Sequence, residues 1–172
     1  MGSNLSSALG NRAAILDSAV RALASLPQTR LVRVSTYHTT RAVSTVAQPD
    51  FLNAVAIVET TLSPRALLDA LLSIEQTHGR HPFADVDASA VPQPGVPEIL
   101  PWQPRTLDLD LILMGTRIVQ EEGLIVPHPR MHTRRFVLVP LAEVLPDALV
   151  PLSNYSGGPM PTVRELLALL PG

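Results

Sequence analysis

Two aspartates, Asp108 and Asp110, stand in the most strand-like segment of the chain, residues 105–113 (RTLDLDLIL). Side chains at positions i and i+2 of a strand point to the same side and lie about 6.6 Å apart along it. The three leucines that alternate with the aspartates are therefore predicted to face the core. Two carboxylates on one face of a half-buried strand repel each other and lose hydration, so a compensating partner is expected.

A divalent metal ion would provide this compensation. Mg²⁺ prefers oxygen ligands, and proteins commonly hold it with one or two carboxylates while water and substrate phosphate complete its shell. The D-x-D pattern is short, so an ordinary solvent-facing pair of acids is the alternative interpretation. Arginines nearby in the sequence favour the interpretation as a metal site, because their guanidinium groups could neutralise the remaining charge of a phosphate.

These arginines bracket the aspartates. Lysine is absent and all 13 basic residues are arginines, so arginine is the only permanent side-chain cation. Arg80 opens a long loop, Arg105 precedes the aspartates, and Arg134 belongs to a cluster of three arginines that follows His128. His128 is framed by prolines, and its position fits either a turn histidine or a donor to phosphate.

Length and composition predict a single globular domain, residues 1–172. Apolar residues make up 46% of the chain and charged residues 16%, and the net charge of −2 argues against a general nucleic-acid binder. No apolar run approaches the roughly 20 residues that span a bilayer, and no signal peptide is visible, so we expect no membrane contact and a cytoplasmic location. The lack of cysteine excludes disulfides, thiolate metal sites and cysteine nucleophiles.

Periodicity and capping signals predict the elements that must position these groups in the first half of the chain. They indicate a helix within residues 8–25, strands at 31–37 and 51–60, and a helix from Ser63-Pro64 to Gly79. Residues 80–104 then carry six prolines and no periodicity. We interpret this segment as a long catalytic loop that is mobile alone and orders over substrate.

The second half begins with the strand at 105–113. An extended stretch at 117–126 and a helix that starts near Thr133 follow it. The C-terminal part, 153–172, is predicted to be a linker and a short helix capped by Thr162. The order helix, strand, strand, helix, strand fits a β-α-β-β-α-β sandwich if one more strand precedes the first helix.

Five blocks of the sequence resemble the 6-hydroxymethyl-7,8-dihydropterin pyrophosphokinase family. They stand in the family's order and cover nearly the whole chain. The P-R-x-x-D-x-D and V-P-H-P-x-M-x-x-R-x-F-V-L patterns within them are long and specific. The blocks are GSNL at 2–5, QPDFLNAV at 48–55, IEQTHGR at 74–80, WQPRTLDLDLIL at 102–113 and VPHPRMHTRRFVLVPL at 126–141.

This resemblance implies an α+β fold, a ferredoxin-like α/β sandwich with helices packed on an antiparallel sheet. It also implies an enzyme of folate biosynthesis, 2-amino-4-hydroxy-6-hydroxymethyldihydropteridine diphosphokinase. Such an enzyme moves the β,γ-diphosphoryl group of ATP to the hydroxymethyl oxygen of the pterin and releases AMP. ATP is the co-substrate, two Mg²⁺ ions take part, and we expect a monomer with small-molecule partners only.

The resemblance assigns roles to the charged residues of the chain. Asp108 and Asp110 match the residues that hold the two Mg²⁺ ions. Arg80 and Arg105 match the family's loop and strand arginines, which bind the triphosphate and steady the transition state. The remaining matches to nucleotide-phosphate contacts are His128 and Arg134.

A second group of residues matches the pterin pocket. Phe51 and Phe136 match the two aromatic positions that sandwich the flat ring, and Asn53 matches the side chain that pairs with its amide-like edge. Thr39 matches another pocket-lining position, and Trp102 a loop aromatic that folds over the substrate. Without the resemblance, the three aromatic residues would be interpreted as core residues.

Several departures from the family leave other interpretations open. The loop is lengthened by an insertion, and Pro101 and Gln103 replace the usual basic residue and glycine. A ferredoxin-like domain that binds pterin or nucleotide with weakened catalysis is therefore one alternative, and a metal-dependent phosphohydrolase is another. GSNL follows an interior first strand in the family, and Met1 stands directly before it here. We therefore expect the natural chain to begin about eight residues earlier, with an apolar strand.

Overall fold

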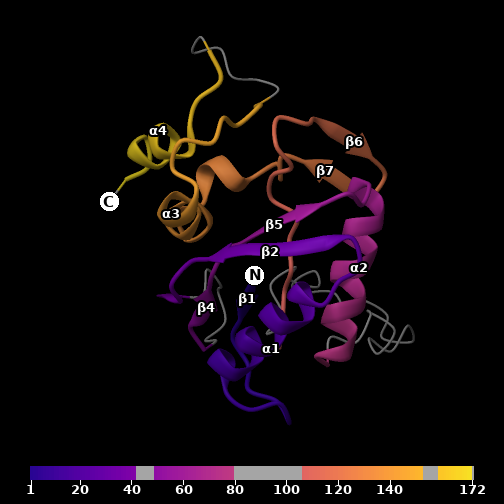
Figure 1. The fold of residues 1–172 in the computed structure, drawn as a ribbon. Coiled ribbons are helices and arrows are strands. Elements are labelled where there is room, and N and C mark those ends of the chain that lie inside the picture. Colours follow the sequence, from indigo (N-terminus) through magenta and orange to yellow (C-terminus); the bar gives the residue numbers. More distant parts are fainter. Residues whose placement is uncertain (42–48, 80–105, 153–158, 172) are drawn as a thin grey trace, which may run out of the picture.

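The computed structural model describes residues 1–41, 49–79, 106–152 and 159–171. In Figure 1, β2 and β5 run between α1 and α2 on one side and α3 and α4 on the other. The elements, in chain order, are β1 (Gly2–Ser3), α1 (Arg12–Ala24), β2 (Thr29–Val34), β3 (His38–Thr40), β4 (Phe51–Asn53), β5 (Ala56–Thr60), α2 (Pro64–Thr77), β6 (Val119–Glu121), β7 (Leu124–Val126), the 3-10 helix η2 (Met131–Thr133), α3 (Arg135–Val144) and α4 (Val163–Ala168).

Antiparallel pairing joins the strands, and β4 lies between β1 and β3 while β5 pairs with β2. Ser35 and Val55 link these two groups of strands. The Ser35 N–H donates to Val55 O, and the Val55 N–H donates to Ser35 Oγ, both at 2.9 Å. An antiparallel sheet with helices packed on it confirms the predicted α+β fold.

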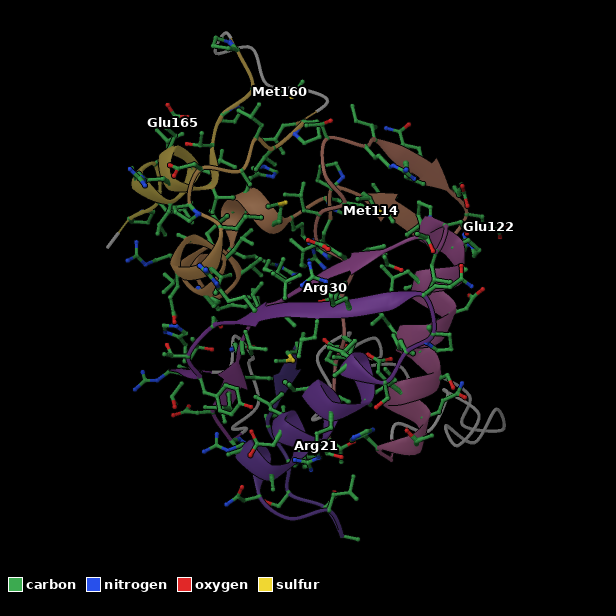
Figure 2. All side chains as sticks on the ribbon, viewed as in Figure 1. Arg21, Arg30, Met114, Glu122, Met160 and Glu165 are labelled. Carbon is green, nitrogen blue, oxygen red and sulfur yellow. The ribbon has the colours of Figure 1, made fainter. Side chains whose placement is uncertain are left out.

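The helices begin where the sequence predicts caps. Ser63 Oγ accepts a hydrogen bond from Ala66 N at 3.2 Å, and Pro64 opens α2. Thr162 and Glu165 form a reciprocal capping box at the start of α4, where Figure 2 labels Glu165. Such caps satisfy backbone N–H groups that the first helical turn leaves unpaired, and each contributes about 1 kcal/mol.

Two buried clusters hold the helices against the strands. The first lies between α1, α2 and the extended segment after residue 106, and its members are Ile15, Leu16, Ala19, Leu23, Leu71, Ile74, Leu107 and Leu109. The second lies between η2, α3, α4 and the segment that precedes α4, and its members are Met131, Val137, Leu138, Leu141, Val150, Val163 and Leu166. Leu107 and Leu109 therefore face the core, as predicted.

The prediction of one strand over residues 51–60 is wrong, because the chain changes partners in its middle. Ala54 pairs with Met1 through two hydrogen bonds of 3.0 Å, one of which the Met1 α-amino group donates. Val55 instead bonds to Ser35. The segment therefore divides into β4, which pairs with β1 and β3, and β5, which pairs with β2.

Two predictions for the second half also need correction. The described part of the predicted strand at 105–113 is extended but forms only one bridge, between Asp108 and Gly2, because β1 is just two residues long. The stretch at 117–126 is a hairpin of β6 and β7. Its turn contains Gly123, whose φ of 69° suits glycine far better than other residues.

A cavity of about 790 Å³ continues the line of β1 beyond Met1. One wall is formed by β5 and the other by residues 109–117, which include Met114, labelled in Figure 2. Leu23 from α1, Leu67 and Leu71 from α2, and Leu141 from α3 close it, together with Leu145 just after α3. The expectation that the natural chain begins earlier stays a prediction.

In the described ranges, no helix is long and apolar enough to cross a membrane. The predicted loop at 80–104 and residues 153–158 of the predicted linker lie outside the described residues. Their assignments stay predictions.

Candidate active site

Backbone pairing places Asn53, Gly2 and Asp108 in one row across three adjacent segments. Gly2 pairs with Asn53 in the ladder of β1 and β4. On its other side, the Gly2 N–H donates to Asp108 O and the Asp108 N–H donates to Gly2 O, both at 2.9 Å. Residues directly opposite each other in antiparallel strands point their side chains to the same face. The amide of Asn53 and the carboxylate of Asp108 thus share a face, with only a glycine between them.

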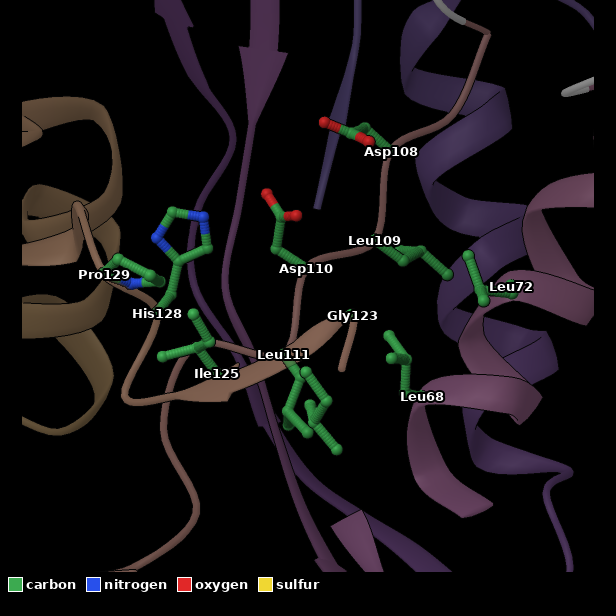
Figure 3. Close-up of a pocket in the computed structure, with 11 residues that line it drawn as sticks. Leu68, Leu72, Asp108, Leu109, Asp110, Leu111, Gly123, Ile125, His128 and Pro129 are labelled. Carbon is green, nitrogen blue, oxygen red and sulfur yellow. The ribbon is translucent and has the colours of Figure 1, made fainter. Parts of the chain in front are cut away.

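The same face carries the neighbours of these residues at i±2. Alternation along β4 adds Phe51 to Asn53, and alternation along the extended segment adds Asp110 to Asp108. Figure 3 shows both aspartates turned away from Leu109, which points toward α2. Strand pairing and alternation therefore place an aromatic ring, an amide and two carboxylates on one face, and the buried side chain of Leu109 points away from it.

The aspartates open into a cavity of about 340 Å³. His128 projects into it beside Asp110 (Figure 3). Its opposite wall is apolar and comes from α2 and β7, with Leu68, Leu72 and Ile125 as lining residues. A cavity with two carboxylates at one end and aliphatic side chains at the other suits a ligand that brings a cation, such as a bound metal ion, together with an apolar part.

Two backbone hydrogen bonds hold His128 in place. Its N–H donates to Ile112 O at 2.9 Å, and its ring Nδ1 accepts from the Arg130 N–H at 3.1 Å. Burial lowers the pKa of His128, Asp110 acts in the opposite direction, and the nearby Arg134 lowers it further. The net lowering of this pKa favours the neutral ring. Because Nδ1 accepts a hydrogen bond, the ring proton lies on Nε2, which can donate to an anion.

Arg134 brings a permanent positive charge to the same side. Its guanidinium lies 5.5 Å from the centroid of the Phe136 ring, at the start of α3. Burial lowers the pKa of Arg134, Arg130 lowers it too, and Asp110 and Asp108 raise it. An arginine stays charged despite such a shift, so the site combines two carboxylates with a cation that can bind phosphate.

The amide of Asn53 has a defined orientation. Asn53 is 8% exposed, and its Nδ2 donates to Thr40 Oγ1 at 2.7 Å. A Cβ atom added at Gly2 would lie 2.8 Å from Asn53 Oδ1, so this close approach requires glycine. Sequence reasoning missed Thr40, because only strand pairing reveals that it lies opposite Phe51.

Comparison with known proteins identifies the family. The family model of 7,8-dihydro-6-hydroxymethylpterin-pyrophosphokinase matches residues 1–146. The chain belongs to this family. The predicted family is therefore confirmed, and the row of Asn53, Gly2 and Asp108 lies within the matched part of this pyrophosphokinase-family chain.

Curated relatives agree with the family assignment. The chain is 39% identical to the 2-amino-4-hydroxy-6-hydroxymethyldihydropteridine pyrophosphokinase of Haemophilus influenzae over 90% of this chain and 84% of the relative. It is also 39% identical to the protein of that name from Pseudomonas aeruginosa, over 99% of this chain and 89% of the relative. A third protein of that name, from Synechocystis, is 38% identical over 90% of this chain and 68% of the relative.

The structure brings together many of the site residues predicted for this family member. Asp110, His128 and Arg134 interact electrostatically, and Asp108 lies beside Asp110 (Figure 3). Thr39 is exposed and pairs with Leu52 rather than Asn53, so its role in a pocket stays a prediction. The remaining predicted site residues, Arg80, Trp102 and Arg105, lie outside the described residues.

The donor set suits Mg²⁺ only with help from a ligand. Among the described residues, no group of three or more histidine, cysteine, aspartate or glutamate side chains could hold a metal ion. Asp108 and Asp110 supply carboxylate oxygens on one face, and Mg²⁺ commonly takes one or two carboxylates together with water and phosphate. The residues present therefore fit Mg²⁺ that arrives with a nucleotide.

Proposed function

We propose that this chain catalyses transfer of the β,γ-diphosphoryl group of ATP to the hydroxymethyl oxygen of 6-hydroxymethyl-7,8-dihydropterin, with release of AMP. The observation that carries the proposal is the shared face of Asn53, Phe51, Asp108 and Asp110, which joins an amide-and-aromatic half to a carboxylate half. A pterin needs the first half and a metal-bound triphosphate needs the second. Family membership supports the same reaction.

The pterin half works through one oriented amide and two rings. Asn53 offers a hydrogen-bond donor and an acceptor on one side chain, which matches the adjacent acceptor and donor on the edge of a pterin ring. Because Nδ2 already donates to Thr40, the amide is held in one orientation before the ligand arrives. Phe51 and Phe136 would stack on the flat ring and place its hydroxymethyl group above Asp108 and Asp110.

The phosphate half works by charge. Asp108 and Asp110 would hold two Mg²⁺ ions, which supply charge neutralisation for the phosphate oxygens when bound. His128 would donate from Nε2 to a phosphate oxygen, and Arg134 would add a permanent cation. The two arginines that the family resemblance adds, Arg80 and Arg105, would complete the binding of the triphosphate.

The proposed reaction is a single displacement at the β-phosphorus of ATP, in which the pterin hydroxyl replaces AMP. The hydroxymethyl oxygen of the pterin forms a bond to the β-phosphorus of ATP and loses its proton to water. The bond between that phosphorus and the oxygen that bridges to the α-phosphorus breaks, and AMP leaves with this oxygen. The protein's part is to hold the two oxygens in line and to exclude competing water.

One assay tests this function against its alternatives. AMP formation is measured from ATP and Mg²⁺ with and without the reduced pterin, and phosphate release is followed in the same samples. AMP that forms only with pterin supports the transferase. Phosphate release that needs no pterin supports a phosphohydrolase, and tight binding of both ligands without either product supports a binding domain. Sedimentation of the same preparation tests the proposed monomer.

A further inference from the structure

A third carboxylate, that of Glu75, lies directly behind the two aspartates. Glu75 stands in the last turn of α2 and is 1% exposed. Its Oε1 accepts a hydrogen bond from the backbone N–H of Leu109 at 2.5 Å. A buried carboxylate costs several kcal/mol unless hydrogen bonds compensate its lost hydration, so this contact is a strong constraint on both groups.

Leu109 is the residue between Asp108 and Asp110, and its backbone direction explains the contact. In an extended chain, successive backbone N–H groups point to opposite sides. The N–H and C=O of Asp108 point to β1 and bond to Gly2. The N–H of Leu109 therefore points away from β1 and toward α2, where Glu75 accepts it.

The segment that carries the aspartates is thus held from three directions. Gly2 holds its backbone on one side and Glu75 holds it on the other. The buried side chains of Leu107 and Leu109 hold it from the core. The single bridge to β1 leaves residues 109–113 without the regular ladder of hydrogen bonds that usually fixes a strand. The orientation of this backbone therefore depends more on the Glu75 carboxylate than it would in an ordinary sheet.

We propose that Glu75 is a positioning residue, which fixes the peptide at Leu109 so that Asp108 and Asp110 present their carboxylates to the same metal-binding space. This inference rests on the proposed function for the role of the aspartates. Rotation of the peptide plane at Leu109 would turn one carboxylate relative to the other. A helix side chain thereby controls ligands that it does not touch, as outer-shell groups do in metal sites.

The charge of Glu75 acts, together with the two aspartates, on the Met1 α-amino group. Burial lowers the pKa of the Met1 α-amino group, while Asp110, Asp108 and Glu75 all act to raise it. A test must therefore separate the acceptor oxygen of Glu75 from its negative charge. Glu75→Gln keeps an oxygen acceptor of the same reach and removes the charge, whereas Glu75→Leu removes both at similar size.

The experiment measures Mn²⁺ binding by electron paramagnetic resonance in the presence of ATP, and the melting temperature of each variant. We expect Glu75→Leu to weaken Mn²⁺ binding about 10- to 100-fold, the usual range for loss of an outer-shell partner. Glu75→Gln should stay within about threefold of the wild type, because it retains the acceptor. Ile74→Ala, on the same helix and in the same buried cluster, is the matched control for lost packing.

The comparison with Ile74→Ala separates loss of the Glu75 acceptor from loss of packing. Ile74→Ala should lower the melting temperature and leave Mn²⁺ binding at the wild-type level. Wild-type Mn²⁺ binding by Glu75→Leu, equal losses in the Gln and Leu variants, or an equal loss in Ile74→Ala would each overturn the positioning role. If Glu75→Leu does not fold, Glu75→Asp withdraws the acceptor by one methylene and should show the same weakening. Failure of the proposed function would instead appear as wild-type protein that binds Mn²⁺ and ATP but forms no AMP with pterin.

Discussion

Removal of the Asn53 amide tests the pterin half of the site directly. Asn53 is nearly buried, and Thr40 orients its amide through a hydrogen bond of 2.7 Å. In Asn53→Ala, the donor and the acceptor on the pterin edge would enter a closed site without partners. In Thr40→Val, the amide remains but loses the group that orients it, at nearly constant side-chain volume.

The two substitutions should lower the affinity for pterin by different amounts. An unsatisfied buried polar group costs about 1 to 3 kcal/mol, so Asn53→Ala should weaken pterin binding roughly 5- to 150-fold. Loss of one neutral hydrogen bond costs about 0.5 to 1.5 kcal/mol, so Thr40→Val should weaken it about 2- to 12-fold. Neither side chain faces the cavity beside His128, so affinity for ATP should stay within about twofold in both variants.

Calorimetric titration with 6-hydroxymethyl-7,8-dihydropterin, and separately with ATP and Mg²⁺, measures these affinities. Asn11→Ala is the matched control, because Asn11 caps α1 and its Oδ1 accepts a hydrogen bond from the Ala14 N–H. It should cost about 1 kcal/mol of stability and leave the pterin affinity unchanged. The double variant at 53 and 40 should bind pterin no worse than Asn53→Ala, since Thr40 acts through the amide.

Two results would refute this reasoning. Equal losses of pterin and ATP affinity in Asn53→Ala would show that the residue supports the fold and not the ring. Additive losses in the double variant would show that Thr40 contacts the ligand itself or acts elsewhere.

Three further predictions concern the metal, the sheet and pH. Asp110→Asn should abolish AMP formation and leave the melting temperature unchanged or higher, because it removes one ionised ligand and relieves repulsion. The control Asp147→Asn, which breaks a surface ion pair with Arg164, should keep wild-type activity. Wild-type AMP formation by Asp110→Asn would contradict the metal assignment. An engineered extension of about six apolar β-branched residues before Met1 should fill the cavity along β5, raise the melting temperature and abolish binding of a hydrophobic dye. A Gly-Ser extension of equal length should change neither the melting temperature nor the dye binding. Hydrogen bonds from the Thr36 backbone, the His38 ring and the Thr36 hydroxyl lower the pKa of Glu143 from 4.5. A carboxyl group with a lowered pKa stabilises the fold above its unfolded pKa and loses that contribution as pH falls through the folded value. The difference in unfolding free energy between the wild type and Glu143→Gln, measured with urea, should therefore be constant above about pH 5.5 and shrink below about pH 4.5; a difference that is independent of pH would contradict the ionised hydrogen bonds.

Much of the local structure was predictable because its signals lie within a few residues of each other. Ser63 and Thr162 cap the helices predicted after them, and alternation correctly placed Leu107 and Leu109 in the core. The boundaries that failed depended on distant partners. The break between β4 and β5 arises because Ala54 bonds to Met1 and Val55 bonds to Ser35, and neither partner is near in sequence.

The sequence by itself determined the family, the paired aspartates and the face on which they lie. Only the tertiary structure decided which other groups share that face. Asn53 and Asp108 are 55 residues apart and become neighbours because both pair with Gly2. The same long-range pairing brings Thr40 to Asn53, and helix packing brings Glu75 to the Leu109 N–H. Periodicity describes which way a side chain points along its own element. Contacts between elements depend on strand register and helix packing, which burial and backbone hydrogen bonding settle for the whole chain at once.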